Sequence, residues 1–390
     1  MMKRIYKIVN GWKAAKELKS NLLKNIDQIF APNKTEESAV SLQIKEIKNI
    51  FALVKSNFNL EQLIELSLTL SNQLLIVRKI KEAEYVLNAL LAEEISDTIE
   101  AEIFLQLADI TIRECRWDEC LRLLSEAKII FEKHSDNLGR AKVENLWGIF
   151  KGERGEIDLA KDHFKIGLSL VKTIENPELA AELESNLAIT EIICHNFVSA
   201  EKYLKNGLNA FPDSEDNRWL AEMIHNYGTL HLHKKNYKQA IEDFDGAIDI
   251  ARENNHLEVL TLSMGAKALA LIYLNKADEG LQLVEDSLNL AEKINDRLAI
   301  ADDYKIIGVG ERIKENYKRS EEYLQKSYEL NMELNNNLNA AESAFELAIL
   351  FKQILNKEKS SNWFKLSAYY FESIGAKNRL KSMEDTLKSI

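Results

Sequence analysis

The chain has 390 residues, 46% of them hydrophobic and 29% charged, with only 3 prolines and 14 glycines. So few helix-breaking residues are typical of a protein that is helical almost throughout. The net charge of −11 argues against nucleic-acid binding by the whole chain, because phosphates are recognised by clustered Lys and Arg. No apolar run reaches the ~18 residues of a membrane span, so none is predicted, and the N-terminus does not read as a secretion signal.

The three cysteines, Cys115, Cys120 and Cys194, are scattered and have no metal-ligand spacing. An odd number of isolated thiols suits a reducing compartment, so a cytoplasmic location is expected.

The N-terminal segment, residues 1–56, is predicted to hold two helices. Apolar residues at three-to-four spacing, from Ile5 to Ile29, predict one continuous helix over residues 3–30, and a second helix is expected to run to about Lys55. Residues 1–30 have a charge balance of +5, which leaves −16 for the rest. Three interpretations of the basic helix stay open: a cap on the first repeat, an arm that binds a partner, or a helix on a membrane surface.

Residues 57–374 are predicted to form a repeat array, in which seven copies follow a fixed step of 40 residues after a degenerate first copy with Ser71, Ala83, Leu87 and Leu90 in its slots. Four columns recur in seven consecutive copies: a small residue, a second small residue, an apolar residue and a third small residue. The columns are Ala108, Gly148, Ala188, Gly228, Ala268, Gly308 and Ala348; Cys120, Ala160, Ala200, Ala240, Gly280, Ser320 and Ser360; Leu124, Phe164, Leu204, Phe244, Val284, Leu324 and Phe364; Ala127, Gly167, Gly207, Ala247, Ser287, Ser327 and Ser367. A period in this range indicates stacked helical pairs, each of which buries its apolar face against its neighbours. Glycines in the middle of a predicted helix, such as Gly148, Gly228 and Gly308, are interpreted as sites of close helix contact.

These columns resemble the tetratricopeptide repeat, in a subgroup with 40-residue steps found in kinesin light chains and in bacterial signalling and peptide-receptor arrays. The resemblance implies an all-α, right-handed superhelical solenoid of about eight helical hairpins with capping helices. The repeats are expected near residues 60–95, 98–134, 138–174, 178–212, 216–254, 258–294, 298–334 and 338–374. A last helix, over residues 375–390, is expected to cover the final repeat.

In tetratricopeptide arrays the first helix of each pair lines a concave groove, and the resemblance implies that certain of its positions face a ligand. Carried over to this chain, the candidate ligand-binding residues are Gln106, Asn145, Glu182, Asn186, Glu222, His225, Asn226 and Lys305. Side-chain amides both donate and accept hydrogen bonds, which suits a peptide backbone. The acids would favour basic residues of the ligand near Glu182 and Glu222, although acids in a first helical turn are equally explained by the helix dipole.

No catalytic motif accompanies the repeats: a nucleophile elbow, a zinc-protease HExxH and a phosphate-binding loop are all missing. His225, His231 and His233 lie on one predicted helix, but their spacing does not let them converge on a metal. No enzymatic activity, cofactor or metal is therefore expected.

The sequence thus predicts a non-catalytic scaffold or sensor that binds a protein or peptide segment in its groove. One alternative is a peptide-gated signalling regulator resembling the response-regulator aspartate phosphatases, whose N-terminal bundle acts on a partner's phosphoaspartate; no catalytic residue of that kind is matched here. Another is the sensor module of a transcription regulator, which the acidic balance disfavours. Neither the partner nor the oligomeric state is predicted.

Overall fold

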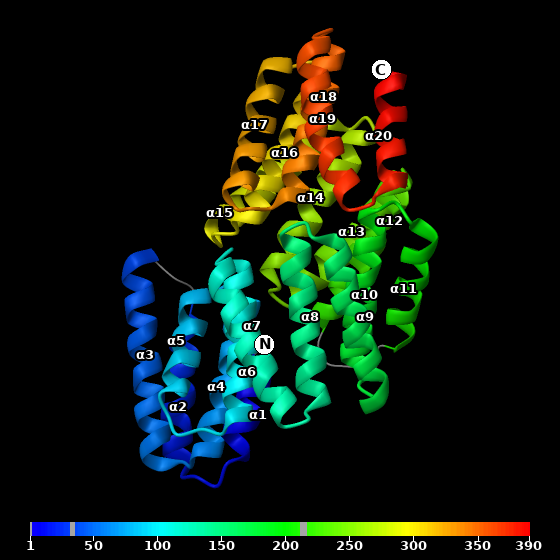
Figure 1. Cartoon of the computed structure of the whole chain (residues 1–390). Helices are drawn as coiled ribbons and strands as arrows, with labels where there is room; N and C mark the ends of the chain where they lie inside the picture. Colours follow the sequence, from blue (N-terminus) through cyan, green and yellow to red (C-terminus); the bar gives the residue numbers. More distant parts are fainter. Residues whose placement is uncertain (1, 32–35, 211–216) are drawn as a thin grey trace. The chain divides into compact units, whose positions relative to one another are not determined.

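The computed structural model describes residues 2–31, 36–210 and 217–390, and over these residues the chain is all helical, with no strand (Figure 1). It separates into two compact units. The first consists of Met1–Thr111 and Asp118–His134, and the second of Ile112–Trp117 and Ser135–Ile390. No helix in the described ranges has both the length and the apolar character that a bilayer crossing requires.

Three helices precede the repeats, not two: α1 (Lys3–Gly11), α2 (Lys16–Ile29) and α3 (Glu36–Asn57). The prediction of one helix over residues 3–30 is wrong, because Trp12 adopts an extended backbone directly after Asn10 and Gly11, two weak helix formers. The break lets the Trp12 ring pack against Phe58, with 4.6 Å between the ring centroids, and lets its Nε1 donate to Glu65 at 3.3 Å. The apolar pattern continues on both sides of the break because both helices face the same core.

Eight helical hairpins follow, as the repeat predicts. Their first helices are α4 (Leu60–Ile76), α6 (Asp97–Arg113), α8 (Asn137–Glu153), α10 (Pro177–Ile193), α12 (Asn217–His233), α14 (Leu257–Tyr273), α16 (Arg297–Ile313) and α18 (Asn337–Gln353). Their second helices are α5 (Ile80–Leu91), α7 (Trp117–Lys133), α9 (Ile157–Ile174), α11 (Phe197–Ala210), α13 (Tyr237–Glu253), α15 (Ala277–Lys293), α17 (Tyr317–Glu333) and α19 (Lys357–Ser373). A final helix, α20 (Lys377–Ser389), ends the chain.

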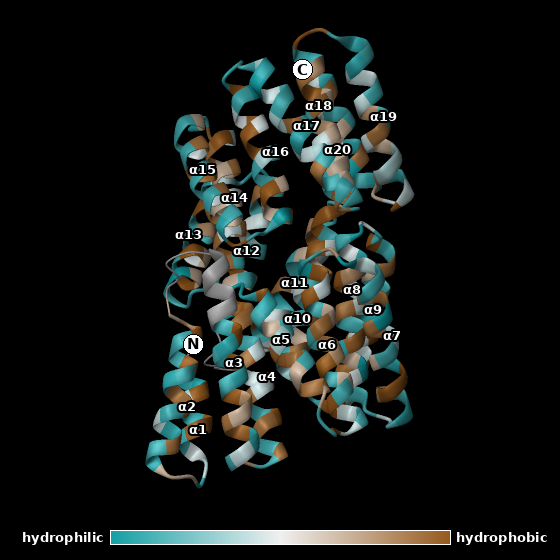
Figure 2. Ribbon diagram, turned by 90° about the vertical axis from the view of Figure 1, so that its left-hand side faces the viewer, coloured by the Kyte–Doolittle hydropathy of each residue, from teal (hydrophilic) through white to brown (hydrophobic). Residues whose placement is uncertain are grey.

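The first two small columns lie where the two helices of a hairpin meet, whereas Gly167 and Gly207 of the last small column lie against the first helix of the next hairpin. A Cβ atom added at Gly228 would lie 2.6 Å from Cε1 of Phe244, and one at Gly308 would lie 2.6 Å from Cγ of Leu324. Phe244 and Leu324 belong to the apolar column and are fully buried. The interpretation of these glycines as sites of close helix contact is therefore confirmed. Hydrophobic and hydrophilic residues occupy different faces of the helices, as Figure 2 shows.

Each described turn from Cys115 to Gly375 contains one residue with a left-handed backbone, and these residues recur every 20 positions, except at position 215, which lies outside the described residues. The turn after α10 is typical: His195 has a φ of 59°, and the N–H of Asn196 donates to the carbonyl of Glu191 at 2.8 Å. This bond satisfies a carbonyl at the helix end. Most of the left-handed residues are not glycine, so composition alone does not mark these turns.

The first helices form the inner side of the array in the second unit. Successive first helices from α8 to α18 contact one another, whereas successive second helices make no comparable contact in the described chain. First helices therefore lie closer together than second helices, so the array curves with the first helices inside.

Candidate functional site

A row of polar side chains crosses the inner side of the array from helix to helix. Asn145 on α8 donates through Nδ2 to Oε1 of Glu182 on α10 at 2.8 Å, and its Oδ1 accepts from Nδ2 of Asn186 at 2.9 Å. Nδ2 of Asn226 on α12 donates to Oγ of Ser185 on α10 at 2.8 Å. The structure thus brings Asn145, Glu182 and Asn186 into one cluster and ties Asn226 to the same helix.

His225 and Glu222 extend this row toward the next repeat. Nδ1 of His225 lies 3.0 Å from Oγ of Ser263 on α14, and burial lowers the pKa of the imidazole to about 4, so the ring is neutral at neutral pH. Glu222 accepts from Nε of Arg218 at 2.7 Å, and Nη2 of the same guanidinium lies 3.7 Å from Glu258 on α14. We name the set Asn145, Glu182, Asn186, Glu222, His225 and Asn226 the amide row.

The 40-residue repeat explains why these side chains meet. Asn145, Ser185 and His225 occupy the same position in consecutive first helices, so each projects toward the same side of the array. Asn145 and its equivalent Ser185 are buried, whereas the five other members of the amide row are half-buried. Gln106 on α6 of the first unit, the repeat equivalent of Asn186, makes a similar link to the preceding first helix, because its Oε1 accepts from Oγ of Ser71 on α4 at 2.5 Å.

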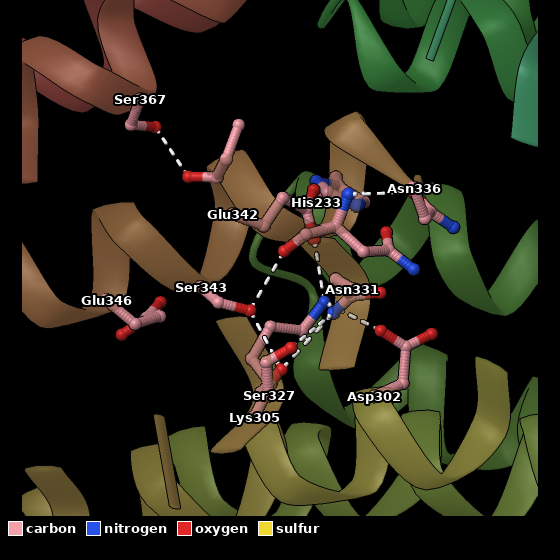
Figure 3. A network of polar contacts seen from close by, with 12 residues as sticks. His233, Asp302, Lys305, Ser327, Asn331, Asn336, Glu342, Ser343, Glu346 and Ser367 are labelled. Atoms are coloured by element: carbon pink, nitrogen blue, oxygen red, sulfur yellow. Dashed lines mark hydrogen bonds and ion pairs between the residues drawn. The ribbon is translucent and has the colours of Figure 1, made fainter. Parts of the chain in front are cut away.

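Lys305 belongs to a second, ionic cluster. Its Nζ lies 3.1 Å from Asp302 and 2.8 Å from Glu342 on α18 (Figure 3). Nη2 of Arg379 on α20 lies 3.4 Å from the same Glu342. Burial opposes the charge of Lys305, but Asp302 and Glu342 outweigh it and raise its pKa. Burial likewise opposes ionisation of Glu342, yet Lys305 and Arg379 lower its pKa to about 2. Lys305 and Glu342 are therefore both charged at neutral pH.

A further buried ion pair adjoins this cluster. Nη2 of Arg312 donates to Oε2 of Glu346 at 2.8 Å, and Oη of Tyr273 lies 3.5 Å from the other oxygen of that carboxylate. Burial raises the pKa of Tyr273, so the phenol stays protonated and can donate. The inner side therefore has one half built mainly of amides and hydroxyls together with Glu182 and Glu222, and a second half built around buried ion pairs.

The three histidines of α12 point to different partners. Nδ1 of His231 lies 2.6 Å from Asp243 on α13, whereas His225 faces Ser263 and His233 faces Arg379. Among the described residues, no group of three His, Cys, Asp or Glu side chains is arranged to hold a metal ion.

Several residues of these clusters are absent from the candidate list, among them Ser185, Ser263, Glu342 and Arg379. Ser185 and Glu342 occupy the repeat positions of Asn145 and Glu182, so a stricter use of the 40-residue step would have included them. Arg379 lies outside the repeats, and no sequence pattern links it to residues more than 140 positions earlier.

Comparison with solved structures shows the fold class. A Rap protein complexed with competence and sporulation factor superposes with a TM-score of 0.65 over 96% of this chain and 99% of that chain, at 14% identity. The Rap conjugation gene regulator of the plasmid pLS20, in complex with the Phr* peptide, gives a TM-score of 0.61 over 95% and 96%, at 13% identity. The apo quorum sensor NprR from B. thuringiensis gives 0.55 over 91% and 99%, at 15% identity. The chain is thus a tetratricopeptide-type helical solenoid, as predicted.

A family model described as anaphase-promoting complex subunit 5 matches residues 189–271 and 310–365. These two segments are less than half of the chain, so they do not place it in that family. No curated protein matches significantly.

Proposed function

We propose that the protein is a non-catalytic peptide sensor or scaffold of the cytoplasm, and that the amide row holds an extended segment of a protein or peptide. The observation that carries the proposal is the row itself: half-buried amides and acids on consecutive first helices, on the inner side of the array. Scattered unpaired thiols support a reducing compartment. Two structurally similar proteins were solved with a bound factor or peptide, which favours the same ligand class.

The hydrogen bonds within the row leave capacity for a ligand. An amide nitrogen carries two donor hydrogens, and Asn186 and Asn226 each use one of them in the described bonds. The second hydrogen can donate to a carbonyl of a peptide, and the fixed first bond sets its direction. Because the side chains are already held, little conformational entropy is lost on binding.

The acidic side chains of the amide row favour a positively charged ligand. Glu182 and Glu222 are half-buried beside the amides, and the chain as a whole is acidic. A ligand with Lys or Arg side chains at these points would gain charge-assisted hydrogen bonds, and its affinity should fall as salt rises.

The test is a binding screen of the full chain against an array of short random-sequence peptides at low salt, followed by anisotropy titrations of the peptides retained. We expect basic peptides to be selected. Glu182→Gln combined with Glu222→Gln should weaken their binding by about tenfold, since each change replaces a charged acceptor by a neutral one that still accepts a hydrogen bond. The matched control is Asp249→Asn, which neutralises a carboxylate on the second helix α13 whose side chain is 73% exposed. Equal loss in both variants, or no loss in the first, would contradict the proposed site.

The amides need a stability measurement beside the titration. Asn186→Ala with Asn226→Ala should weaken binding by roughly five- to a hundredfold, at about 0.5–1.5 kcal/mol for each lost bond. The same change removes the hydrogen bonds to buried Asn145 and Ser185. A loss of folding stability of about 1–3 kcal/mol is therefore expected in addition. Normal binding by the folded double variant would exclude the amide row as the site.

A second candidate function is a peptide-gated regulator whose N-terminal helices act on a partner protein. It is favoured by a polar hollow between α2 and α3, lined by Asn21, Lys24, Asn25, Gln28, Asn49, Ala52, Leu53 and Ser56. Lys24→Glu would test it by co-purification of partners from cells. This substitution should abolish the co-purification of a protein that binds in the hollow, and it should leave peptide binding at the amide row intact. A partner list that is unchanged would count against this candidate.

A further inference from the structure

The end of the chain packs against two turns that lie more than 180 residues earlier. Oη of Tyr370 donates to the carbonyl of Gly155 at 2.7 Å, and Nδ2 of Asn378 donates to Oδ1 of Asn196 at 2.9 Å. Gly155 allows this approach, because an added Cβ atom would lie 2.6 Å from Oη of Tyr370. We name these contacts, together with those of Arg379 below, the closure contact. It joins the ends of α8 and α10 to α19 and α20, so the second unit closes on itself.

An apolar cluster supports the closure contact. It includes Ile157 and Cys194 from the earlier hairpins and Phe345, Phe371 and Met383 from the last three helices. The two sides therefore share a core, and separating them would expose buried apolar surface.

The polar centre of the closure contact is the guanidinium of Arg379. Its Nη1 lies 2.6 Å from Nε2 of His195 and 3.4 Å from Nδ1 of His233, and its Nη2 lies 3.4 Å from Glu342. A guanidinium has only donors, so each of these ring nitrogens must present a lone pair. Both imidazoles are therefore neutral while the contact is made, with the proton of His195 on Nδ1 and that of His233 on Nε2.

We propose that acidification opens the closure contact, because protonation of His195 or His233 places an imidazolium directly against the Arg379 guanidinium. Protonation also replaces a hydrogen-bond acceptor with a donor that faces another donor. The inference concerns the closure of the second unit and does not depend on the proposed peptide site.

The charges around the two rings do not compensate for an added proton. The two rings face each other, with 5.4 Å between their centroids, and the other groups that face them are Arg379 from α20, Glu342 from α18, Lys305 from α16 and Lys235 from the turn after α12. Glu342 is the one carboxylate among them, and it already contacts both Lys305 and Arg379. A fourth or fifth positive charge would therefore find no free anion there.

The direction of the pH effect follows from the two rings. Burial first and Arg379 second lower the pKa of His195 to about 3 and that of His233 to about 4. In an opened molecule the rings return to the ordinary pKa of about 6.5. The closed form is thus fully favoured above pH ~6.5 and loses stability as the pH falls below it. Well below pH 6.5 each histidine changes the open-to-closed ratio by up to about tenfold per pH unit, which amounts to roughly a thousandfold for both between pH 7.5 and 5.

The experiment is hydrogen exchange of the full chain at pH 7.5 and pH 5.0, corrected for the intrinsic rate and measured in peptides from α20 and from the turn at residues 154–156. Both segments should lose protection at pH 5.0, by up to about a thousandfold, while α14 keeps its protection. Unchanged protection of α20 at pH 5.0 would overturn the inference.

Variants assign the effect to the two rings. His195→Asn with His233→Gln should stay closed at pH 5.0, whereas the control His231→Gln, on the same helix but paired with Asp243, should open as the native chain does. If the double variant is already open at pH 7.5, the same hydrogen-exchange measurement on Arg379→Gln tests the proposed cause. Removing that cation should shrink the acid response, and a response of full size in this variant would refute the proposed cause.

Discussion

Replacing Gly228 by leucine should destabilise the second unit by overpacking the core of one hairpin. The added Cβ atom would lie 2.6, 2.7 and 3.0 Å from three carbons of the Phe244 ring, all well inside ordinary van der Waals contact. Phe244 has no exposed surface, so its ring cannot move into solvent. Overpacking of this kind costs about 1–3 kcal/mol or more. Leucine also has a higher helix propensity than glycine, which offsets nearly 1 kcal/mol of this destabilisation.

We therefore expect a net loss of about 1–2 kcal/mol, which lowers the melting temperature by roughly 2–8 °C for a unit of this size. Thermal and urea unfolding followed by circular dichroism would measure it. The matched control is Gly246→Ala on the other helix of the same hairpin. Its added Cβ atom would meet its nearest neighbour, Ile224, at 3.6 Å, so this variant should gain stability by about 0.5–1 kcal/mol.

The double variant Gly228→Leu/Phe244→Ala should lose less stability than the sum of its single changes, because the smaller side chain makes room for the leucine. A melting curve of Gly228→Leu that matches the native curve would refute the assignment of this column to the helix contact.

Two other predictions follow from buried groups. Deleting residues 1–30 removes Ile5, Leu22 and Ile26, all fully buried, so the shortened chain should aggregate or melt several degrees lower; an unchanged melt and normal solubility would contradict this packing. Asp303 has an unpaired buried oxygen and a pKa raised to about 8 by burial. The folded state thus binds an extra proton between pH ~4 and 8, and stability should fall as the pH rises through that window, by up to about 1.4 kcal/mol per unit. Asp303→Asn should flatten this slope and unfold at higher urea than the native chain at pH 8.5, and equal slopes would disprove it.

The repeated part of the fold could be predicted because each column has one physical role. Gly228 and Phe244 meet inside one hairpin, and the same constraint at every step fixes the phase of all helices. The break after α1 could not be predicted from periodicity, since the apolar stripe continues past Trp12. There, a tertiary contact with Phe58 and Glu65 outweighs local helix preference.

Only those residues of the candidate site that occupy repeated positions could be predicted from the sequence. The positions of Asn145, Asn186 and Asn226 follow from the 40-residue step, and the structure adds the bonds between them. Arg379 and His195 belong to no shared pattern, because their contact depends on the curvature accumulated over the intervening hairpins. Small angles between neighbouring hairpins are not encoded in residue type at any one position.

The closure contact also restricts which insertions and deletions of whole hairpins the protein can accommodate. The described turns from Cys115 to Gly375 follow a 20-residue spacing. An insertion or deletion of 40 residues would therefore keep every first helix on the inner side of the array and every second helix on the outer side. A hairpin inserted between Gly155 and Tyr370 would nevertheless displace Tyr370 by one repeat, and the hydrogen bond between these two residues would be lost. The number of hairpins between these two residues is therefore constrained even though each hairpin, taken alone, could be copied or removed.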